Sequence, residues 1–456
     1  MKINNDIDRK KTPEKVDRRQ FLGLLGKAFV GAAGMSLLGP LGSSFGQSLP
    51  GEKGIVITDI KVATLRGLNS TSRIVRLDTN KGISGYGECR VEDRNSQTEL
   101  NKCAPVILGM NPSRVDQVFD TITALLNPTA NWTQITYASG AIAAIECACW
   151  DITGKIYNVP IWKLLGPKLR DGMRMYCDTP SQRSISAMQY AVEERVNKGF
   201  TWFKTDLDRI LSSSDYTTSP DPNPYTASGG RAQKILDSGY TKWMDYISAY
   251  RGMIGDYPLG ADHFFAWSPS GGGLQLDVAS AIKTSNILGA PEYMNSKLGG
   301  WMEDIIPWHY YDELAQIKAG TDMSILTGED IFGVPLLREL VDADAIDIFH
   351  PDPATFGGIQ PTLQAALYAH SKGVKTAFHM SNGPIALIMN AHISAAIPEF
   401  LSCEHHYTDV SWYDSLLDGI PKPIMGKDGF LPIPEGPGLG VTINEDVLRQ
   451  HGTWFA

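Results

Sequence analysis

The segment that decides the fold runs SILTGEDIFGVPLLRELVDADAIDIF over residues 324–349. Short runs rich in Ile, Leu and Phe stand at its two ends, and an amphipathic helical pattern lies between them. This order is typical of a parallel sheet, because a crossover helix is needed to bring the chain back beside the same strand. The segment therefore predicts one β-α-β unit of an α/β protein.

The same alternation continues through most of the chain after residue 170. Short apolar or β-branched runs separated by helical patterns occur at residues 173–176, 202–204, 259–262, 301–303, 324–327, 345–349, 375–379 and 400–404. Eight such strands favour a (β/α) barrel over a doubly wound sheet. No Gly-rich nucleotide-binding fingerprint follows the early strands, which disfavours nucleotide-dependent chemistry.

A smaller α+β unit is predicted before the barrel. Alternating runs at 55–57, 72–77 and 84–88 predict a small antiparallel sheet, and helical patterns follow at 96–130 and 138–156. We expect this unit over residues 51–165, the barrel with the catalytic site over 166–405, and a C-terminal segment over 406–456 that packs on the first unit. The Ser/Pro/Gly-rich stretch 211–232 is expected to be a long loop on the active-site side of the barrel.

Residues 1–50 have the pattern of an export signal. Arg18 and Arg19 precede Phe21-Leu22, a weakly apolar stretch rich in Gly and Ala, and a small-residue tail. Paired arginines in this place resemble the twin-arginine signal, which carries folded proteins across a membrane. An ordinary secretory signal and a membrane anchor are the alternatives, and Lys27 and Pro40 weaken the anchor. We expect a periplasmic or otherwise exported protein with no membrane span after signal removal.

The composition excludes some classes of function. The chain has 456 residues, 43% of them hydrophobic, with ten Trp and a net charge of −9, so it can bury a large core and lacks the basic balance of a nucleic-acid-binding protein. Its six cysteines show no metal-binding spacing, and a disulfide framework is not expected. Cys147 and Cys149 lie in an apolar run and are interpreted as small buried residues of a helix.

Charged residues follow the predicted strands one after another. They are Lys204, Asp262, Glu303, Glu329, Asp352, His379 and Glu404. Since parallel barrel strands end at one face, these side chains are expected around one mouth, where barrel enzymes keep their active sites. Carboxylates gathered so closely repel one another unless a cation lies among them.

Asp262, Glu303 and Glu329 are the candidate metal ligands. Oxygen-only ligation favours Mg²⁺ over Zn²⁺, which prefers His and Cys. A helix-capping role is the alternative for each carboxylate taken alone.

Asp352 and His379 lie on neighbouring predicted strands. A carboxylate that binds one imidazole nitrogen raises the basicity of the other, so the pair is a candidate general base. A buried structural histidine is the alternative. Four other histidines have no comparable context and are interpreted as structural or supporting, namely His350, His392, His405 and His406.

Several motifs resemble the mandelate racemase and muconate lactonizing enzyme branch of the enolase superfamily. The likeness covers nearly the whole chain after the signal, and it is carried by Gly82–Glu88 (GISGYGE), Ala148–Lys155 (ACWDITGK), Leu164-Leu165-Gly166, Glu303-Asp304, Thr327–Asp330 (TGED) and Asp352 with Gly357-Gly358. The resemblance implies a capping α+β domain that closes over a modified (β/α)₇β barrel of the TIM type.

The resemblance also implies roles for the site residues. It assigns Asp262, Glu303 and Glu329 to Mg²⁺, and Asp352 with His379 to the catalytic dyad. Glu404 matches the eighth-strand carboxylate that meets the substrate carboxyl group when protonated. In this scheme Mg²⁺ holds the substrate carboxylate, His379 takes the α-proton, and the metal stabilises the enediolate. Members are commonly multimeric, so a homo-oligomer is expected.

Two departures from the branch bear on the reaction. The branch often has Lys-x-Lys on the second strand, with the second Lys as the opposite base, whereas this chain has Lys204-Thr205-Asp206. Asp206 is assigned no proton-transfer role. The third strand ends Asp262-His263-Phe264, and the role of His263 is open. His263 and Trp308 are the candidates for substrate binding.

Three functions are weighed. Loss of the second Lys favours an acid-sugar dehydratase that works from His379. A racemase or epimerase of a 2-hydroxy acid or sugar acid, with Lys204 as the opposing base, is the alternative. An exported barrel that only binds a sugar or metal is disfavoured, because binding alone needs no tuned base. In all three the partner is a small molecule, for the enzymes a carboxylate.

Overall fold

The computed structural model describes residues 53–68, 71–91, 96–126, 137–179, 182, 184–207, 210–222, 231–262, 276–406 and 409–455. The predicted signal, residues 1–50, and the candidate His263 lie outside the described residues. Among the helices that are described, none combines the length and the apolar character needed to cross a bilayer.

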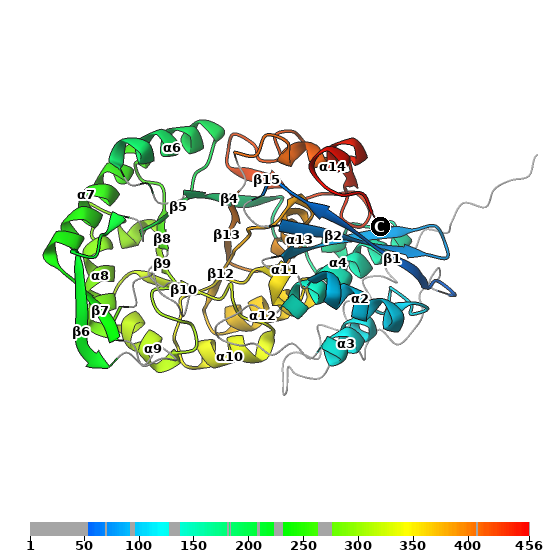
Figure 1. Cartoon of the computed structure of the whole chain (residues 1–456), viewed down its shortest axis with the longest axis horizontal. Coiled ribbons are helices and arrows are strands. Elements are labelled where there is room, and N and C mark those ends of the chain that lie inside the picture. Colours follow the sequence, from blue (N-terminus) through cyan, green and yellow to red (C-terminus); the bar gives the residue numbers. More distant parts are fainter. Residues whose placement is uncertain are drawn as a thin grey trace, which may run out of the picture. The chain divides into compact units, whose positions relative to one another are not determined.

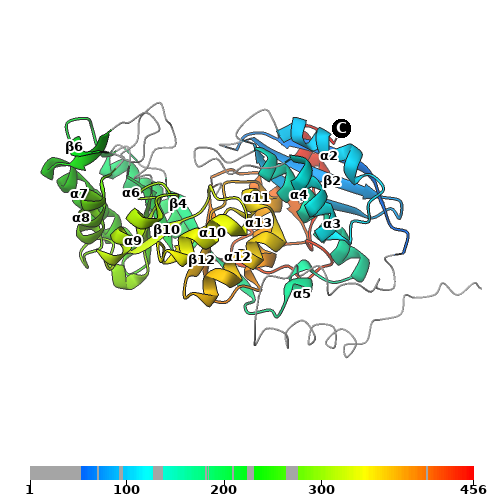
Figure 2. The same cartoon turned by 90° about the horizontal axis from the view of Figure 1, so that it is seen from below.

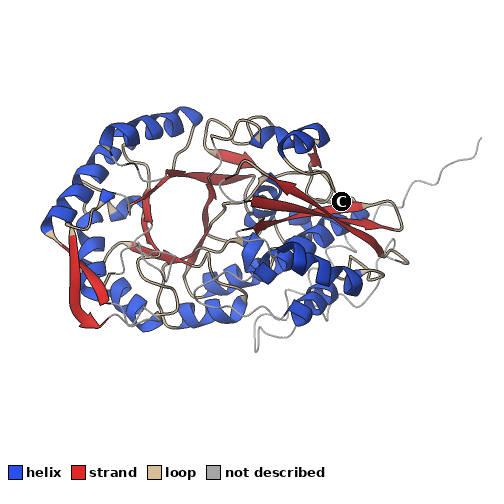
Figure 3. Ribbon diagram, viewed as in Figure 1, coloured by secondary structure: helices blue, strands red, loops and turns tan. Residues whose placement is uncertain are grey.

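The central element is a closed parallel barrel, drawn as a ring of strands inside a ring of helices in Figures 1 and 3. Its strands follow the order β4 (Gly172–Thr179), β5 (Phe203–Asp206), β8 (Leu259–Asp262), β9 (Trp301–Glu303), β10 (Ser324–Thr327), β11 (Ile348–Phe349), β12 (Lys375–Phe378) and β13 (Phe400–His405). The barrel closes because β13 pairs with β4. The predicted strands and the (β/α)₇β barrel are confirmed.

Helices connect successive strands and cover the outside of the barrel. They are α6 (Ile185–Lys198), α7 (Asp237–Ile254), α8 (Val278–Leu288), α9 (Tyr311–Ala319), α10 (Val334–Asp342), α12 (Ile359–Ser371) and α13 (Pro384–Ser394), with the short α11 (Pro353–Phe356) before α12. Helix α6 shows how the sequence sets these limits. Ser184 caps its start by accepting a hydrogen bond from the backbone of Ala187, and Gly199 ends it with φ 102°.

Apolar and aromatic side chains fill the barrel below the strand ends. The cluster consists of Tyr176, Trp202, Trp301, Leu326, Ile348 and Ala377, with Leu401 packed against it. Gly260 makes room for the largest member, since a Cβ there would lie 2.7 Å from the Trp301 ring. Because the barrel interior is filled by side chains, a substrate-binding site can lie only at an end of the barrel, and barrel enzymes use the C-terminal face.

The first unit is an antiparallel sheet with helices beside it (Figure 2). It contains β1 (Ile57–Leu65), β2 (Thr71–Thr79), β3 (Ser84–Val91), α2 (Ser96–Ile107), α3 (Val115–Leu126), α4 (Tyr137–Tyr157) and α5 (Ile161–Leu165). Helix α4 approaches β3 closely at two glycines. A Cβ on Gly85 or Gly87 would lie 2.2 or 1.9 Å from a carbonyl oxygen of α4. Cys147 and Cys149 are buried in α4, as predicted.

Two buried glutamates of the first unit bind the start of barrel helices. Glu146 accepts hydrogen bonds from the backbone of Ile359 (2.8 Å) and Gln360 (2.9 Å) at the start of α12. Glu88 accepts them from Gly383 (2.6 Å) and Ala386 (3.0 Å) at the start of α13. Burial raises the pKa of both carboxyl groups to about 7. The two carboxyl groups accept hydrogen bonds from N–H groups that have no partner within the helix. They also lie at the N-terminal, positive end of the helix dipole.

Replacing Glu146 by Ala is expected to lower the free energy of unfolding by about 3 kcal/mol, because two buried N–H groups lose their acceptor. Urea denaturation followed by circular dichroism measures the change. Glu99→Ala is the control, since the partner of Glu99 among the described residues is the half-exposed Lys102, and about 0.5 kcal/mol or less is expected. Equal losses in the two variants would contradict the role of Glu146.

The raised pKa of Glu146 also predicts a pH dependence of stability. The folded state binds an extra proton between the ordinary carboxyl pKa of 4.5 and about 7. The contribution of this proton to the free energy of unfolding is therefore complete below pH 4.5 and is lost as the pH rises through 7. Over this range the free energy of unfolding should fall less in Glu146→Gln than in the unmodified protein.

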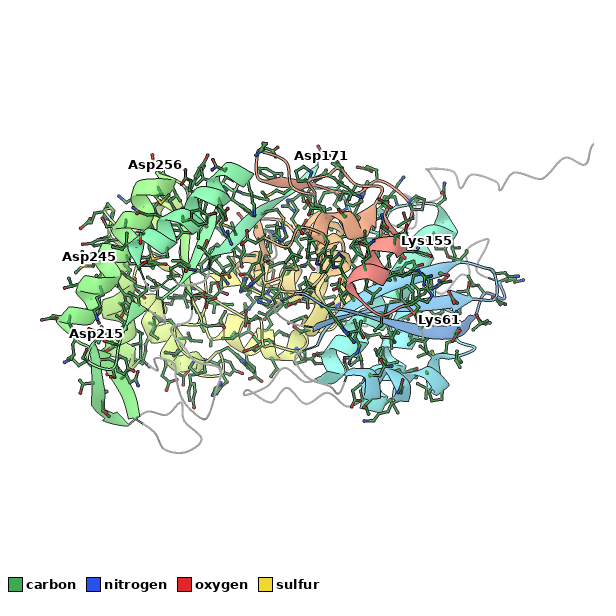
Figure 4. The ribbon with its side chains drawn as sticks, turned by 45° about the horizontal axis from the view of Figure 1, so that its top comes forward. Lys61, Lys155, Asp171, Asp215, Asp245 and Asp256 are labelled. Atoms are coloured by element: carbon green, nitrogen blue, oxygen red, sulfur yellow. The ribbon has the colours of Figure 1, made fainter. Side chains whose placement is uncertain are left out.

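The C-terminal residues contact both units. Strand β15 (Phe430–Pro432) pairs antiparallel with β4, and β14 (Leu417–Asp418) pairs with β16 (Thr442–Ile443). After α14 (Glu445–His451), Thr453 donates to the carbonyl of Thr64 at 2.9 Å. Asp151 of α4 accepts from the backbone of Leu439 and pairs with Lys155, which Figure 4 labels.

Part of the expected loop 211–232 is a β-hairpin. Strand β6 (Tyr216–Pro222) pairs antiparallel with β7 (Arg231–Ile235), and residues 223–230 between them lie outside the described part. The Ser, Pro and Gly residues indicated a loop, but Tyr216, Thr217 and Thr218 favour a strand. The hairpin lies between β5 and α7, and so follows the C-terminal end of a barrel strand.

Candidate active site

The charged residues predicted from the strand ends come together at the mouth of the barrel. Each is less than one tenth exposed, and the set is Lys204, Asp262, Glu303, Glu329, Asp352, His379 and Glu404. Register explains the convergence: Asp206 of β5 lies beside Asp262 of β8, and Glu303 of β9 beside Leu326 of β10. Alternate residues of a strand point to the same face. The apolar side chains that fill the barrel therefore form one layer, and the charged side chains form the next layer toward the mouth.

His379 follows β12 and is oriented by Asp352. Its Nδ1 lies 2.9 Å from Asp352 Oδ2, while its backbone N–H donates to the carbonyl of Pro351. Asp352 is fixed in turn, because its other oxygen accepts from the backbone of Ala354 and because Asn382 Nδ2 donates to the carboxylate at 2.9 Å. A carboxylate bound at Nδ1 fixes the imidazole and makes Nε2 the atom for proton transfer. Nε2 itself lies 3.0 Å from Glu329 Oε2.

Lys204 lies among three carboxylates. Its Nζ is 2.9 Å from Asp262, 3.2 Å from Glu303 and 2.5 Å from Glu404. Burial alone would lower the pKa of Lys204, but these carboxylates outweigh it and hold the pKa well above its ordinary value. These contacts favour the ammonium form of Lys204.

Glu404 lies between Lys204 and two histidines. Its Oε1 is 3.1 Å from His406 Nε2, and its Oε2 is 3.6 Å from His379 Nε2. Burial would raise the pKa of Glu404, but Lys204, His406 and His379 hold it well below the ordinary value. The resemblance implied a protonated carboxyl group at this position, whereas these neighbours favour the ionised form of Glu404 when no substrate is bound.

Glu303 is held from below the mouth. Trp301 Nε1 donates to its Oε2 at 3.0 Å, and His350 Nδ1 lies 3.2 Å from its Oε1. The other nitrogen of His350 is 2.8 Å from the hydroxyl of Tyr176. His350, interpreted from the sequence as structural or supporting, thus lies beside a candidate metal ligand.

The carboxylates fit a hard divalent cation. Ligand atoms of Glu303, Glu329 and His350 lie within 4.8 Å of one another, and Asp262 shares the Lys204 ammonium with Glu303. Negative charge is concentrated here: desolvation, followed by Glu303 and Asp262, raises the pKa of the half-buried Asp304 well above its ordinary value. Oxygen donors in this number suit Mg²⁺. The predicted triad was Asp262, Glu303 and Glu329. In the structure Glu303 and Glu329 are grouped with His350, and Asp262 is linked to Glu303 through Lys204.

Sequence reasoning missed a second histidine–carboxylate pair at the mouth. His406 Nδ1 lies 3.4 Å from Asp178 Oδ2, on the neighbouring strand β4. Burial would lower the pKa of His406, but Glu404 and Asp178 raise it. Burial and Asp206 raise the pKa of Asp178 to about 7. The available signal was the spacing of His406, two residues after Glu404 and hence on the same face of the strand.

The two candidate substrate-binding residues have different outcomes. Trp308 is buried in the main core, with its ring 5.8 Å from His309 and 6.4 Å from Tyr311. His263 lies outside the described residues, directly after Asp262. Both assignments stay predictions.

Comparison with family models identifies this architecture. The mandelate racemase / muconate lactonizing enzyme N-terminal domain matches residues 58–166, and the enolase C-terminal domain-like model matches residues 187–447. The chain belongs to the mandelate racemase and muconate lactonizing enzyme family. The two matched parts of the chain correspond to the α+β unit and to the barrel with the C-terminal residues. The resemblance seen in the sequence is therefore confirmed.

Similar members of this family include sugar-acid dehydratases. The chain is 27% identical to a D-xylonate dehydratase from Haloferax volcanii, over 87% of this chain and 88% of the relative. It is 24% identical to a D-galactonate dehydratase from Verminephrobacter eiseniae, over 83% and 90%. A 3,6-anhydro-D-galactonate cycloisomerase from Zobellia galactanivorans shares the fold with a TM-score of 0.70 at 20% identity, over 88% of this chain and all of that one.

Proposed function

We propose that this protein is a hydro-lyase that removes water from a sugar acid after abstracting the proton next to the carboxylate. The observation that carries the proposal is the buried His379–Asp352 pair, at 2.9 Å, beside the cluster of carboxylates at the barrel mouth. Relatives named D-xylonate and D-galactonate dehydratase, each matched over most of its length, support this class of substrate.

The base in this proposal is Nε2 of His379. Asp352 holds the imidazole through Nδ1 and stabilises the imidazolium that forms when the α-proton is taken. Asn382 and the backbone of Ala354 hold Asp352 in place, so that the base keeps its direction toward the mouth. Burial of the pair excludes water from the proton transfer.

Asp262, Glu303 and Glu329 would hold Mg²⁺. When bound, the ion supplies positive charge for the substrate carboxylate and for the charge that develops as the α-proton leaves. Trp301 would orient Glu303 through its hydrogen bond to Oε2. Lys204 would place a second positive charge beside the same substrate carboxylate.

A racemase or epimerase is the second candidate function. It needs a base on each face of the α-carbon, and Lys204 is the candidate for the second one. The three carboxylates around Lys204 hold it protonated, which makes it a poor base in the free enzyme. The geometry therefore favours the dehydratase.

Incubation with a panel of sugar acids in D₂O tests the proposal. A dehydratase forms a 2-keto-3-deoxy acid, detected with semicarbazide and by proton NMR. Deuterium at the α-carbon without a keto product would indicate an epimerase and would contradict the proposal. Binding without exchange or product would indicate a binding protein.

We also propose export through a twin-arginine-type signal, on the basis of Arg18 and Arg19 before the weakly apolar stretch 23–41. Replacing both arginines by lysines should leave the precursor in the cytoplasm, because the signal is read through these side chains. Cell fractionation and immunoblotting measure the distribution. Replacement of Arg9 and Lys10 by alanine serves as the control. An unchanged exported yield in the Arg18/Arg19 variant would indicate an ordinary secretory signal or an anchor.

A further inference from the structure

We infer that His406 is a second catalytic residue, the general acid that protonates the departing β-hydroxyl group of the substrate. This inference rests on the proposed dehydration and deepens it. Removal of the α-proton is only half of the reaction, because hydroxide is a poor leaving group and needs a proton as the carbon–oxygen bond breaks.

The environment of His406 matches that of His379. Each imidazole has its Nδ1 beside a carboxylate, Asp352 for His379 (2.9 Å) and Asp178 for His406 (3.4 Å). Glu404 lies 3.1 Å from Nε2 of His406 and 3.6 Å from Nε2 of His379. The Nε2 atom of His379 also lies 3.0 Å from Glu329. The ring centroids are 5.9 Å apart. One carboxylate thus lies beside both imidazole groups, which follow the neighbouring strands β12 and β13.

The charges around His406 suit an acid. Asp178 faces it from β4, Glu404 from its own strand β13, Lys204 from β5 and His379 from β12, with His405 adjacent in sequence. Burial would lower the pKa of His406, but the two carboxylates outweigh it and raise the pKa, which favours the protonated form relative to an ordinary histidine. Lys204 is less suited, because its ammonium is already bound by three carboxylates.

The proton and electron balance closes with these two histidines. His379 Nε2 takes the α-proton, and the electron pair of that bond becomes the double bond between the α- and β-carbons. The β-carbon–oxygen bond breaks, and the oxygen takes the proton of His406 Nε2 and leaves as water. The enol product becomes the keto acid without net proton uptake. His379 has then gained one proton and His406 has lost one, and Glu404 lies between the two Nε2 atoms to return it.

A purely structural His406, which only neutralises Glu404, gives different kinetics. Loss of a structural residue would lower every reaction of the site. Loss of an acid would lower only those steps in which the leaving group needs a proton. An analogue of the active sugar acid with fluorine in place of the departing hydroxyl separates the two roles, because fluoride leaves without protonation.

The experiment compares His406→Asn with the unmodified enzyme on the hydroxyl substrate, the fluoro analogue and α-deuterium exchange in D₂O. We expect water loss to fall by about 10²–10⁴-fold, while fluoride loss and exchange stay within about threefold. His370→Asn is the control, since His370 is a half-exposed surface residue paired with Glu399, and it should change none of the three rates.

A second variant keeps the inference testable if His406→Asn does not fold. Asp178→Asn removes a carboxylate that raises the pKa of His406. The alkaline limb of the pH profile for water loss should then move to lower pH, with fluoride loss unmoved. Equal losses on both substrates, or unchanged water loss, would overturn the role of His406. An unmodified enzyme that neither exchanges nor eliminates on any acid would instead overturn the proposed function, and this assignment with it.

Discussion

Turnover of the His379→Asn variant is expected to fall by about 10²–10⁴-fold, the range for losing a positioned general base. Asn keeps a polar group near Asp352 but cannot take the α-proton. Asp352→Asn should also lower turnover, because Nδ1 of His379 would lose the carboxylate that lies 2.9 Å away. Initial rates with the active sugar acid measure both effects, and metal affinity should change little in Asp352→Asn.

Isotope exchange decides whether His379 is the base. In D₂O the His379→Asn variant should incorporate no deuterium at the α-carbon, whereas His370→Asn should behave as the unmodified enzyme. Asp206→Ala should affect turnover much less than His379→Asn, because Asp206 is assigned no proton transfer. Near-normal turnover in His379→Asn together with an inactive Lys204→Ala would mean that the chemistry runs from the opposite face.

Replacing Glu303 by Gln is expected to abolish activity, with a loss of about 10³-fold or more. The change removes one charge from the group that would hold Mg²⁺, and a bound metal contributes several kcal/mol to charge stabilisation. The side chain keeps its size and its neighbours Trp301 and His350. Calorimetric titration with Mg²⁺ should show weakened binding, and circular dichroism should show the fold intact.

The matched control for Glu303→Gln is Asp312→Asn, an exposed carboxylate on the helix that follows β9. It should leave both Mg²⁺ affinity and turnover unchanged. Full activity of the unmodified enzyme in excess chelator would reject the metal assignment.

The barrel and the first set of site residues could be predicted because both follow from local pattern. Short apolar runs such as 259–262, 301–303 and 324–327 are the strands of the structure with the same bounds. Each ends at or just before a carboxylate, and parallel strands bring their ends to one face. The local sequence is therefore enough to predict that Asp262, Glu303 and Glu329 lie close together.

The second histidine pair could not be predicted in the same way. His406 and Asp178 are 228 positions apart, and they meet only because β13 pairs with β4 in the register that places His405 beside Cys177. That register is set by closure of the whole barrel. The charge states of Lys204 and Glu404 could not be predicted from the sequence either. They depend on three carboxylates from different strands that surround one ammonium group.

The two glutamates that reach from the first unit to the barrel limit how freely these units can be exchanged between relatives. Glu146 and Glu88 bind the helices that follow Asp352 and His379 in the chain, so the precision of the catalytic pair depends on a separate unit. A barrel produced without its partner would expose unpaired N–H groups at both helix starts. A chimera would keep its active-site geometry only if the incoming unit supplied both carboxylates at the same two places.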